Sequence, residues 1–222
     1  MQKFDSPAPV SAVLDIPAGR IRFIAADRAD TTVEVLPVDA SKSRDVKAAE
    51  QIEVAYGDGV LRIEAPAAKN RILGQAGSVE VTVQLPAGSS VEAKAAAAEL
   101  RGVGRLGDVA FEAAQGSVKL DETGGARLTL LAGDISVGRL GGPAQISTQK
   151  GDLGIAEAVG GAVALRTEQG DISVGAARGV SASLDAGTGH GRIHNSLMNA
   201  DGAADLTIHA TTAYGDITAR SV

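Results

Sequence analysis

Four aspartates recur in the same local setting, directly after a glycine and directly before an aliphatic residue. They are Asp134, Asp152, Asp171 and Asp216, and their glycines are Gly133, Gly151, Gly170 and Gly215. A ladder of acids could bind calcium, but calcium-binding repeats place Asp two residues before the buried aliphatic residue in both halves of every coil. Here the acid is adjacent to the aliphatic residue and occurs in one half only. We therefore predict that each Asp is a turn residue whose carboxylate accepts a backbone N–H.

One copy of this turn carries a base in place of the acid. Arg192 follows Gly191, and it could bridge Asp171 and Asp216 if the repeats stack in register. A base at this position favours structural turns over a metal ladder.

Two of the three histidines have a spacing that binds zinc in helical proteins. His190 and His194 are four residues apart, which on a helix would bring both imidazoles to one metal. Glycines at 187, 189 and 191 disfavour a helix, and on a strand the two rings would be roughly 13 Å apart. His209 offers no obvious third ligand. We expect solvated histidines and no metal site.

The segment Gly102–Gly107, which reads GVGRLG, matches the dinucleotide-binding pattern G-x-G-x-x-G. Asp121 and Glu122 lie close to where a ribose-binding acid could fall. Part of the pattern returns as GRLG at Gly138–Gly141, however, and no helical periodicity follows Gly107. We interpret the segment as a repeat turn, with a dinucleotide-binding loop as the alternative.

Composition narrows the chemistry further. The chain has no Cys, which excludes disulfides, thiolate metal sites and Cys nucleophiles. Aromatic residues make up 2% of the chain, too few for platforms that stack sugars or bases, and the net charge of −6 opposes binding to a phosphate backbone. No G-x-S-x-G elbow occurs. We expect no catalytic residue, no cofactor and no nucleic-acid partner.

The elements that position these residues repeat with a period near twenty. Glycines at 116, 133, 151, 170, 191 and 215 open copies of a short strand and stand 17 to 24 residues apart. A second strand lies out of phase in each period, and both strands alternate apolar with polar or small residues. Two strands and two tight turns in about 18–20 residues predict a short right-handed parallel β-solenoid, an all-β fold.

The first 88 residues show a different pattern. Strand-like segments are joined by turns such as Pro17–Gly19 and Gly57–Gly59, which suit antiparallel hairpins. We predict an antiparallel β cap over residues 1–88 and solenoid repeats over residues 89–222, joined in one continuous unit. Asp39–Glu50 is expected to be a loop or a short helix. Val91–Leu100 has high helix propensity, but the turns on both sides predict the first solenoid strand.

The sequence VQLPAG at Val83–Gly88, a strand of small residues, and recurring Gly-Asp-Ile copies with Gly-Gly turns resemble a known family. This is the bacterial β-strand-repeat family of unknown function, whose members are often labelled putative adhesins. The resemblance covers nearly the whole chain and is most specific over Val79–Thr218. It implies a β-solenoid-like fold and no established activity. Members commonly carry a membrane anchor ahead of the repeats, and none is visible in this sequence.

These observations predict a non-enzymatic structural or interaction module that presents flat solenoid faces to an unidentified protein or cell-envelope partner. The exposed interaction face would include Ser136, Gln145, Arg166 and Ser173. The alternatives are a self-assembling cytoskeletal scaffold resembling the bactofilins and a polysaccharide-acting solenoid enzyme. Because neither a signal peptide nor a transmembrane segment is visible, we expect a cytoplasmic protein without direct membrane insertion.

The last coil raises the question of an open end. The sequence stops five residues after Ile217, and an uncovered coil would leave a row of unpaired backbone groups. Either the long period from Asn195 to Tyr214 folds over this end, or the coil pairs with a second copy. We favour the covered monomer, with self-association through the C-terminal coil as the alternative.

Overall fold

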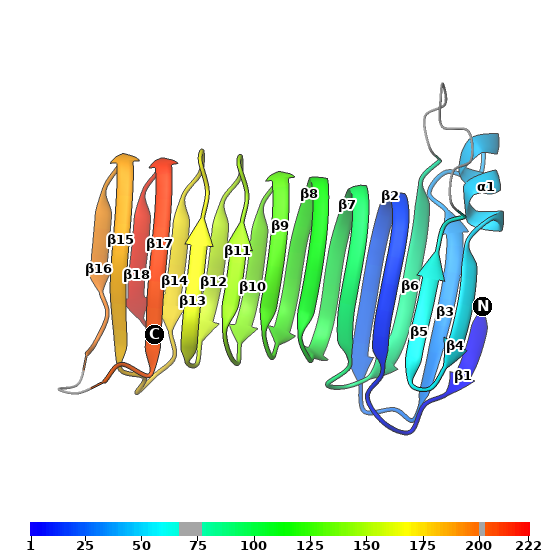
Figure 1. The fold of residues 1–222 in the computed structure, drawn as a ribbon, viewed down its shortest axis with the longest axis horizontal. Helices are drawn as coiled ribbons and strands as arrows, with labels where there is room; N and C mark the ends of the chain where they lie inside the picture. The colour runs from blue at the N-terminus through cyan, green and yellow to red at the C-terminus, as the bar shows by residue number, and fades with distance from the viewer. Residues whose placement is uncertain (67–76, 200–202) are drawn as a thin grey trace.

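The computed structural model describes residues 1–66, 77–199 and 203–222, which form a rod of stacked strands (Figure 1). The elements in chain order are β1 (Gln2–Asp5), β2 (Ser11–Ala26), β3 (Asp30–Pro37), α1 (Ser43–Glu50), β4 (Glu53–Gly57), β5 (Val60–Glu64), β6 (Val79–Pro86), β7 (Ser90–Leu106), β8 (Val109–Thr123), β9 (Ala126–Ala132), β10 (Ile135–Leu140), β11 (Ala144–Ser147), β12 (Leu153–Ala158), β13 (Gly161–Arg166), β14 (Ile172–Ala176), β15 (Ala182–His190), β16 (Ile193–Ser196), β17 (Leu206–Tyr214) and β18 (Ile217–Ser221). The predicted all-β, solenoid-like fold is confirmed.

Each coil of the chain contributes one strand segment to each of two facing layers. The first layer runs β4-β5-β2-β7-β8-β9-β11-β13-β17-β15, and the second runs β1-β3-β6-β2-β7-β8-β10-β12-β14-β18-β16. The long strands β2, β7 and β8 belong to both layers because they bend at the edge of the rod and continue on the other side. Within the coil stack the pairing is parallel and in register.

The interior is filled by columns of aliphatic side chains from equivalent positions of successive coils. One column contains Ile135, Leu153, Ile172 and Ile217, each 1% exposed. Burial of one such side chain is worth roughly 1.5–3 kcal/mol. The narrow gap between the layers has room for aliphatic side chains, which agrees with the scarcity of aromatic residues.

The glycines of the repeat mark one edge of the rod, where the chain passes from the first layer to the second. Gly133, Gly151 and Gly170 have φ angles of 135° to 150°. A Cβ on any of them would lie 1.6–2.1 Å from the carbonyl oxygen of the glycine in the preceding coil. Glycine is therefore required at this edge both by the backbone conformation and by the close stacking of coils.

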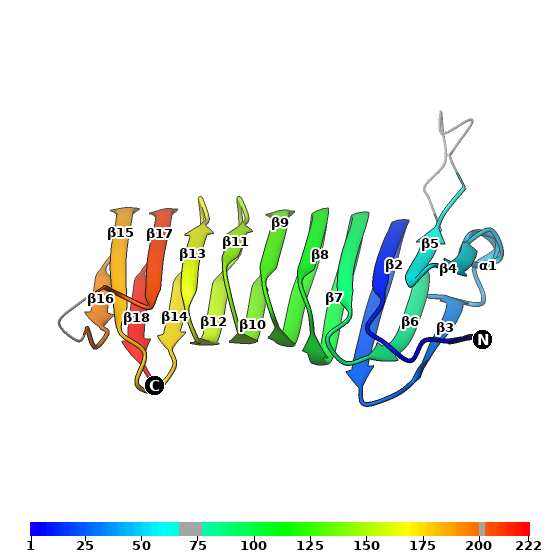
Figure 2. The ribbon, with the colours of Figure 1, turned by 60° about the horizontal axis from the view of Figure 1, so that its bottom comes forward.

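The order of the coils in space departs from their order in the sequence at both ends of the rod. The coil of β17 and β18 lies between β13/β14 and β15/β16 (Figures 1 and 2). At the other end, β2 lies between β5/β6 and β7. The expectation that the coil of Ile217 is the last one in the stack is therefore wrong, since β16 lies beyond it and covers it. The outermost coil is the preceding one, β15 and β16.

The N-terminal region is less distinct from the solenoid than the sequence indicated. Antiparallel pairing is confined to β1–β3, β3–β6 and β4–β5, whereas β2, β5 and β6 join the parallel stack. Pairing therefore does not change at residue 88. Pro17–Gly19 is a bend within β2 and not a hairpin turn, because Gly19, with a φ of 145°, occupies the same edge position as the repeat glycines. The prediction of a strand over Val91–Leu100 is confirmed by β7. Of the two alternatives for Asp39–Glu50, a loop or a short helix, the structure shows the helix α1.

The two ends of the rod differ in how they are covered. At the N-terminal end, Phe4 of β1 and Tyr56 of β4 come from opposite layers, and their ring centroids lie 5.2 Å apart. Helix α1 packs against β3 and β6 beside them. At the other end the outermost strands are β15 and β16, and most of the residues of this coil are exposed.

Candidate functional site

The four aspartates form a continuous ladder along the second layer, where each carboxylate accepts the backbone N–H at the equivalent position of the next coil. Asp134 Oδ1 accepts from Asp152 at 2.9 Å, Asp152 Oδ1 from Asp171 at 2.8 Å, and Asp171 Oδ1 from Asp216 at 2.7 Å. These aspartates are turn residues whose carboxylates bind the backbone of the neighbouring coil. Among the described residues, no group of three His, Cys, Asp or Glu side chains is placed to hold a metal ion.

Arg192 ends the ladder and does not bridge Asp171 and Asp216, because its coil is the outermost one. Its backbone N–H donates to Asp216 Oδ1 at 2.8 Å, and its Nη2 donates to Asp216 Oδ2 at 2.9 Å. The backbone N–H of Arg192, together with its guanidinium, holds the pKa of Asp216 below its usual value.

A second ladder consists of threonines that lie next to the repeat glycines, at the same edge of the rod. Thr167 Oγ1 donates to the carbonyl of Gly151 at 3.1 Å, and Thr212 Oγ1 donates to that of Gly170 at 3.1 Å. Both threonines are buried. We did not predict this ladder from the sequence, although the pattern Thr-x-x-Gly ends at the glycine of four repeat turns, at 148–151, 167–170, 188–191 and 212–215. It satisfies carbonyls that would otherwise be unpaired at the turn.

The histidines lie apart from one another. His190 stacks on Tyr214 with ring centroids 4.8 Å apart. His194 lies beyond the turn on β16, and His209 Nδ1 lies 3.2 Å from Asp185 Oδ2. Each histidine therefore has a separate environment, and none of them belongs to a group of three metal-ligating side chains among the described residues.

The segment Gly102–Gly107 belongs to a strand and its turn. Residues 102–106 form the end of β7, and β8 begins at Val109 without an intervening helix. The N–H of Gly104 donates to Asp121 Oδ2 at 3.3 Å, so this acid binds the protein's own backbone. A dinucleotide-binding loop needs the N-terminus of a helix at this point, and the structure has a strand there.

The four residues expected on one interaction face are divided between the two layers. Ser136 and Ser173 lie on β10 and β14 of the second layer, while Gln145 and Arg166 lie on β11 and β13 of the first. They point to opposite sides of the rod because the chain changes layer within every coil. They therefore make two faces rather than one.

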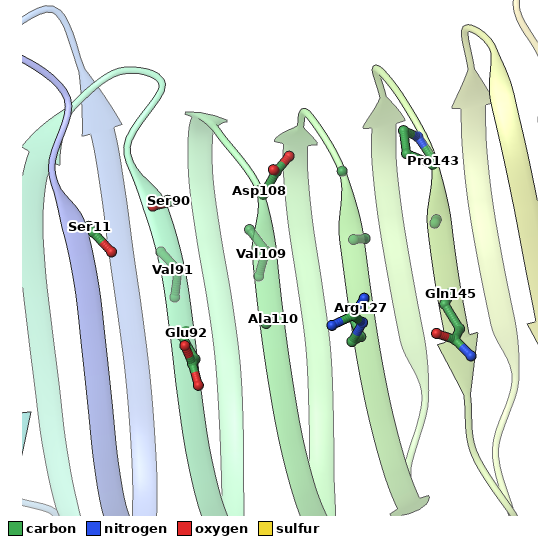
Figure 3. Close-up of a pocket in the computed structure, with 13 residues that line it drawn as sticks. Ser11, Ser90, Val91, Glu92, Asp108, Val109, Ala110, Arg127, Pro143 and Gln145 are labelled. Carbon is green, nitrogen blue, oxygen red and sulfur yellow. The ribbon is translucent and has the colours of Figure 1, made fainter.

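A groove of about 560 Å³ crosses the outer surface of the first layer near the start of its strands (Figure 3). In register, Glu92 of β7, Ala110 of β8, Arg127 of β9 and Gln145 of β11 form a row. Ala110 is the low point of this row, between an acid on one side and a base on the other. Ser11, Ser90 and Asp108 line the same groove. We call this the Glu92–Arg127 groove.

The second layer carries a smaller hollow of about 380 Å³ that includes Ser136, Gly154, Ser173, Thr218 and Arg220. The side chains that line this hollow are mostly small. Its residues come from β10, β12, β14 and β18, which are adjacent in the stack.

The family model described as Toastrack DUF4097 matches residues 13–221. The chain belongs to this Toastrack family. The match confirms the resemblance inferred from the Gly-Asp-Ile copies, and the family is a domain of unknown function. No match is found among curated proteins. No helix in the described parts of this Toastrack chain is long and apolar enough to cross a membrane.

Solved structures of bacterial proteins are similar to this Toastrack chain. A putative adhesin from Parabacteroides distasonis ATCC 8503 has 18% sequence identity and a TM-score of 0.50, over 100% of this chain and 95% of that chain. A putative cell adhesion protein from Clostridium sporogenes ATCC 15579 has 13% identity and a TM-score of 0.42, over 100% of this chain and 98% of that chain. The first of these likenesses shows a shared fold.

Proposed function

We propose that this Toastrack chain is a non-enzymatic interaction module that binds a protein or cell-envelope partner through the Glu92–Arg127 groove. The observation that supports this most is the row of Glu92, Ala110, Arg127 and Gln145, which places an acid and a base on either side of a low point. Within the described residues Arg127 has no ion-pair partner, and Glu92 has only Lys94, at 3.9 Å. Both charges are therefore available to a partner.

The groove suits a partner that covers it more than a substrate that reacts in it. It lies on the outer surface of the first layer, and its charged side chains, Glu92, Asp108 and Arg127, are exposed to solvent. Enzymes usually exclude water from the reacting groups. None of the residues that line the groove is aromatic, so it lacks the platforms on which sugars stack. The Parabacteroides distasonis protein of the same fold is described as a putative adhesin, which is the same class of function.

The self-assembling scaffold remains a weaker alternative. A filament built end to end needs two open ends. Phe4, Tyr56 and α1 cover the N-terminal end of the rod, which favours a module with one free end over a repeating filament.

The proposal is tested by site-specific photo-crosslinking in the native cell with a crosslinking amino acid at Ala110, the low point of the groove. We expect a discrete adduct that is lost in Arg127→Glu. The matched control is Lys119→Glu, which makes the same charge change at an exposed position of β8 in the opposite layer, and which should keep the adduct. Equal adduct in all three proteins, or its loss in both variants, would contradict the proposal.

A further inference from the structure

The outer coil of β15 and β16 leaves the solenoid unfinished. Among the described residues no strand pairs with the outer edge of either strand. Ile193 belongs to the same interior column as Ile172 and Ile217, yet it is 46% exposed whereas they are 1% exposed. Leu184 and Leu197 are also only partly buried. The N–H of Ala182, at the start of β15, donates to the carbonyl of Met198 at 3.1 Å. Beyond that residue this end presents two strand edges without a strand partner and an apolar strip between them.

Both features of this end need to be covered at the same time. Unpaired strand edges readily pair with other strands, and exposed apolar surface favours association. A single extended peptide would pair with one edge only, and would leave the other edge and the apolar strip in water. A second copy of the same end presents two edges at the same separation with the same strip between them. The opposite end of the rod does not match, because Phe4 and Tyr56 close the space between its layers.

The directions of the two edge strands fit a second copy of the same end. Strands β15 and β16 lie in opposite layers and run in opposite directions (Figures 1 and 2). A two-fold axis parallel to the strands would therefore place β15 antiparallel beside β16 of the second copy. The same operation places the apolar strip around Ile193 of one copy against that of the other.

We propose that the chain forms a two-fold symmetric dimer through its outer coil, in which β15 of each copy pairs with β16 of the other. The dimer buries Ile193 and closes both free edges. It goes beyond the proposed function, because the Glu92–Arg127 groove lies several coils away and stays open in both copies. Two grooves on one particle would strengthen attachment to a surface that carries many partners.

Sedimentation velocity over a hundredfold concentration range tests the dimer. We expect a mass near twice 22.3 kDa that falls to 22.3 kDa on dilution, and Ile193→Asp should stay at 22.3 kDa throughout with the circular dichroism of the wild type. The matched control is Leu131→Asp, at a position of β9 that is 50% exposed and far from the outer coil, and it should dimerise normally. A monomeric wild type, growth beyond a dimer, or equal loss in both variants would overturn the proposal.

A single introduced cysteine tests the arrangement of the strands, because the chain has no Cys. Gly187 lies in β15 with open space around it. In the proposed dimer the two copies of β15 belong to opposite layers, roughly 10 Å apart, so Gly187→Cys should dimerise without a disulfide between the copies. A dimer that pairs β15 with β15 would bring the two cysteines together, and a disulfide-linked dimer under mild oxidation would therefore overturn the proposed pairing.

Discussion

The two ends of this rod differ in whether the apolar interior between the layers is covered. At the N-terminal end, strands β1, β3 and β4 pair antiparallel with the stack, and Phe4 meets Tyr56 across the gap between the layers. At the other end the coil of β15 and β16 simply stops. The interior column therefore ends at Ile193, which is 46% exposed. The comparison indicates that the apolar interior is closed at the first end and accessible for association at the second.

The two ends also differ in the order of their strands. The coil of β17 and β18 comes last in the sequence but is the second coil from its end, so β18 has β14 on one side and β16 on the other. At the other end β1 is both the first strand in the sequence and the outermost strand of the second layer, where it pairs with β3. Pairing on both sides should protect β18 from fraying.

The largest difference in stability between the interior and the open end is expected when the same substitution, Ile to Asp, is made at two positions of one interior column. Ile217→Asp places a carboxylate between Ile172 and Ile193 and should destabilise the fold by about 3–5 kcal/mol, because a buried charge has no partner there. Ile193→Asp should destabilise it by about 1 kcal/mol or less, since that side chain already meets water. Urea unfolding followed by circular dichroism, at a concentration where the protein is monomeric, measures both. Equal destabilisation by the two variants would show that the coil order is wrong.

Several of these features could be predicted from the sequence. The Gly-Asp-Ile copies predict the length of the repeat, the residues that point inward and the positions of the turns, because all three features depend on residues that are neighbours in the chain. The order of the coils could not be predicted in this way. Parallel strands from any two repeats can pair in register, so local patterns do not say whether β14 lies beside β18 or β16. Two residues did carry a signal: Asn195 occupies an inward position opposite Ala219, and Arg192 replaces the ladder acid.

The Glu92–Arg127 groove could not be predicted from the sequence for a similar reason. Glu92, Ala110 and Arg127 come from three different coils, and they form a row only once the register of β7, β8 and β9 is known. The division of Ser136 and Gln145 between opposite layers follows from the two changes of layer in each coil. The turns indicate these changes of layer only once the solenoid fold is known.

A smaller effect should separate glycines inside the stack from those on the outer coil. Gly170→Ala puts a Cβ 2.0 Å from the carbonyl oxygen of Gly151 and adds a side chain to a φ of 150°, which should destabilise the protein by roughly 2–4 kcal/mol. Gly187 of β15 has open space around it, and Gly187→Ala should change stability by about 0.5 kcal/mol or less. Thermal unfolding of both variants provides the comparison. A large loss in Gly187→Ala would mean that something covers β15 in the monomer.

The smallest effect concerns the ion pairs that hold the outermost strands at each end. Arg28 and Lys3 lower the pKa of Asp30 to about 2, and Lys3 ties β1 to β3 through this contact. The backbone N–H and guanidinium of Arg192 lower the pKa of Asp216 at the other end. A lowered pKa stabilises the fold above the unfolded value of 3.8, and this contribution is lost as pH falls through the folded value.

We therefore expect both ends to loosen below about pH 4 before the interior does. A carbon-detected NMR titration should give Asp30 a midpoint near 2. In Arg192→Gln the midpoint of Asp216 should rise part of the way back, because the backbone N–H remains, while that of Asp30 should not move. A shift of both midpoints in this variant would contradict the assignment of separate ion pairs to the two ends.

Hydrogen–deuterium exchange of the Ile193→Asp variant measures the order of the coils in solution, because this variant should be monomeric and keep its coil order. We expect amides of β17 and β18 to exchange as slowly as those of β13 and β14, and amides of β15 and β16 to exchange much faster, although β17 and β18 come later in the sequence. Fast exchange in β17 and β18 with protection in β15 and β16 would contradict this expectation, since the coils would then follow the order of the chain and the open end would lie elsewhere.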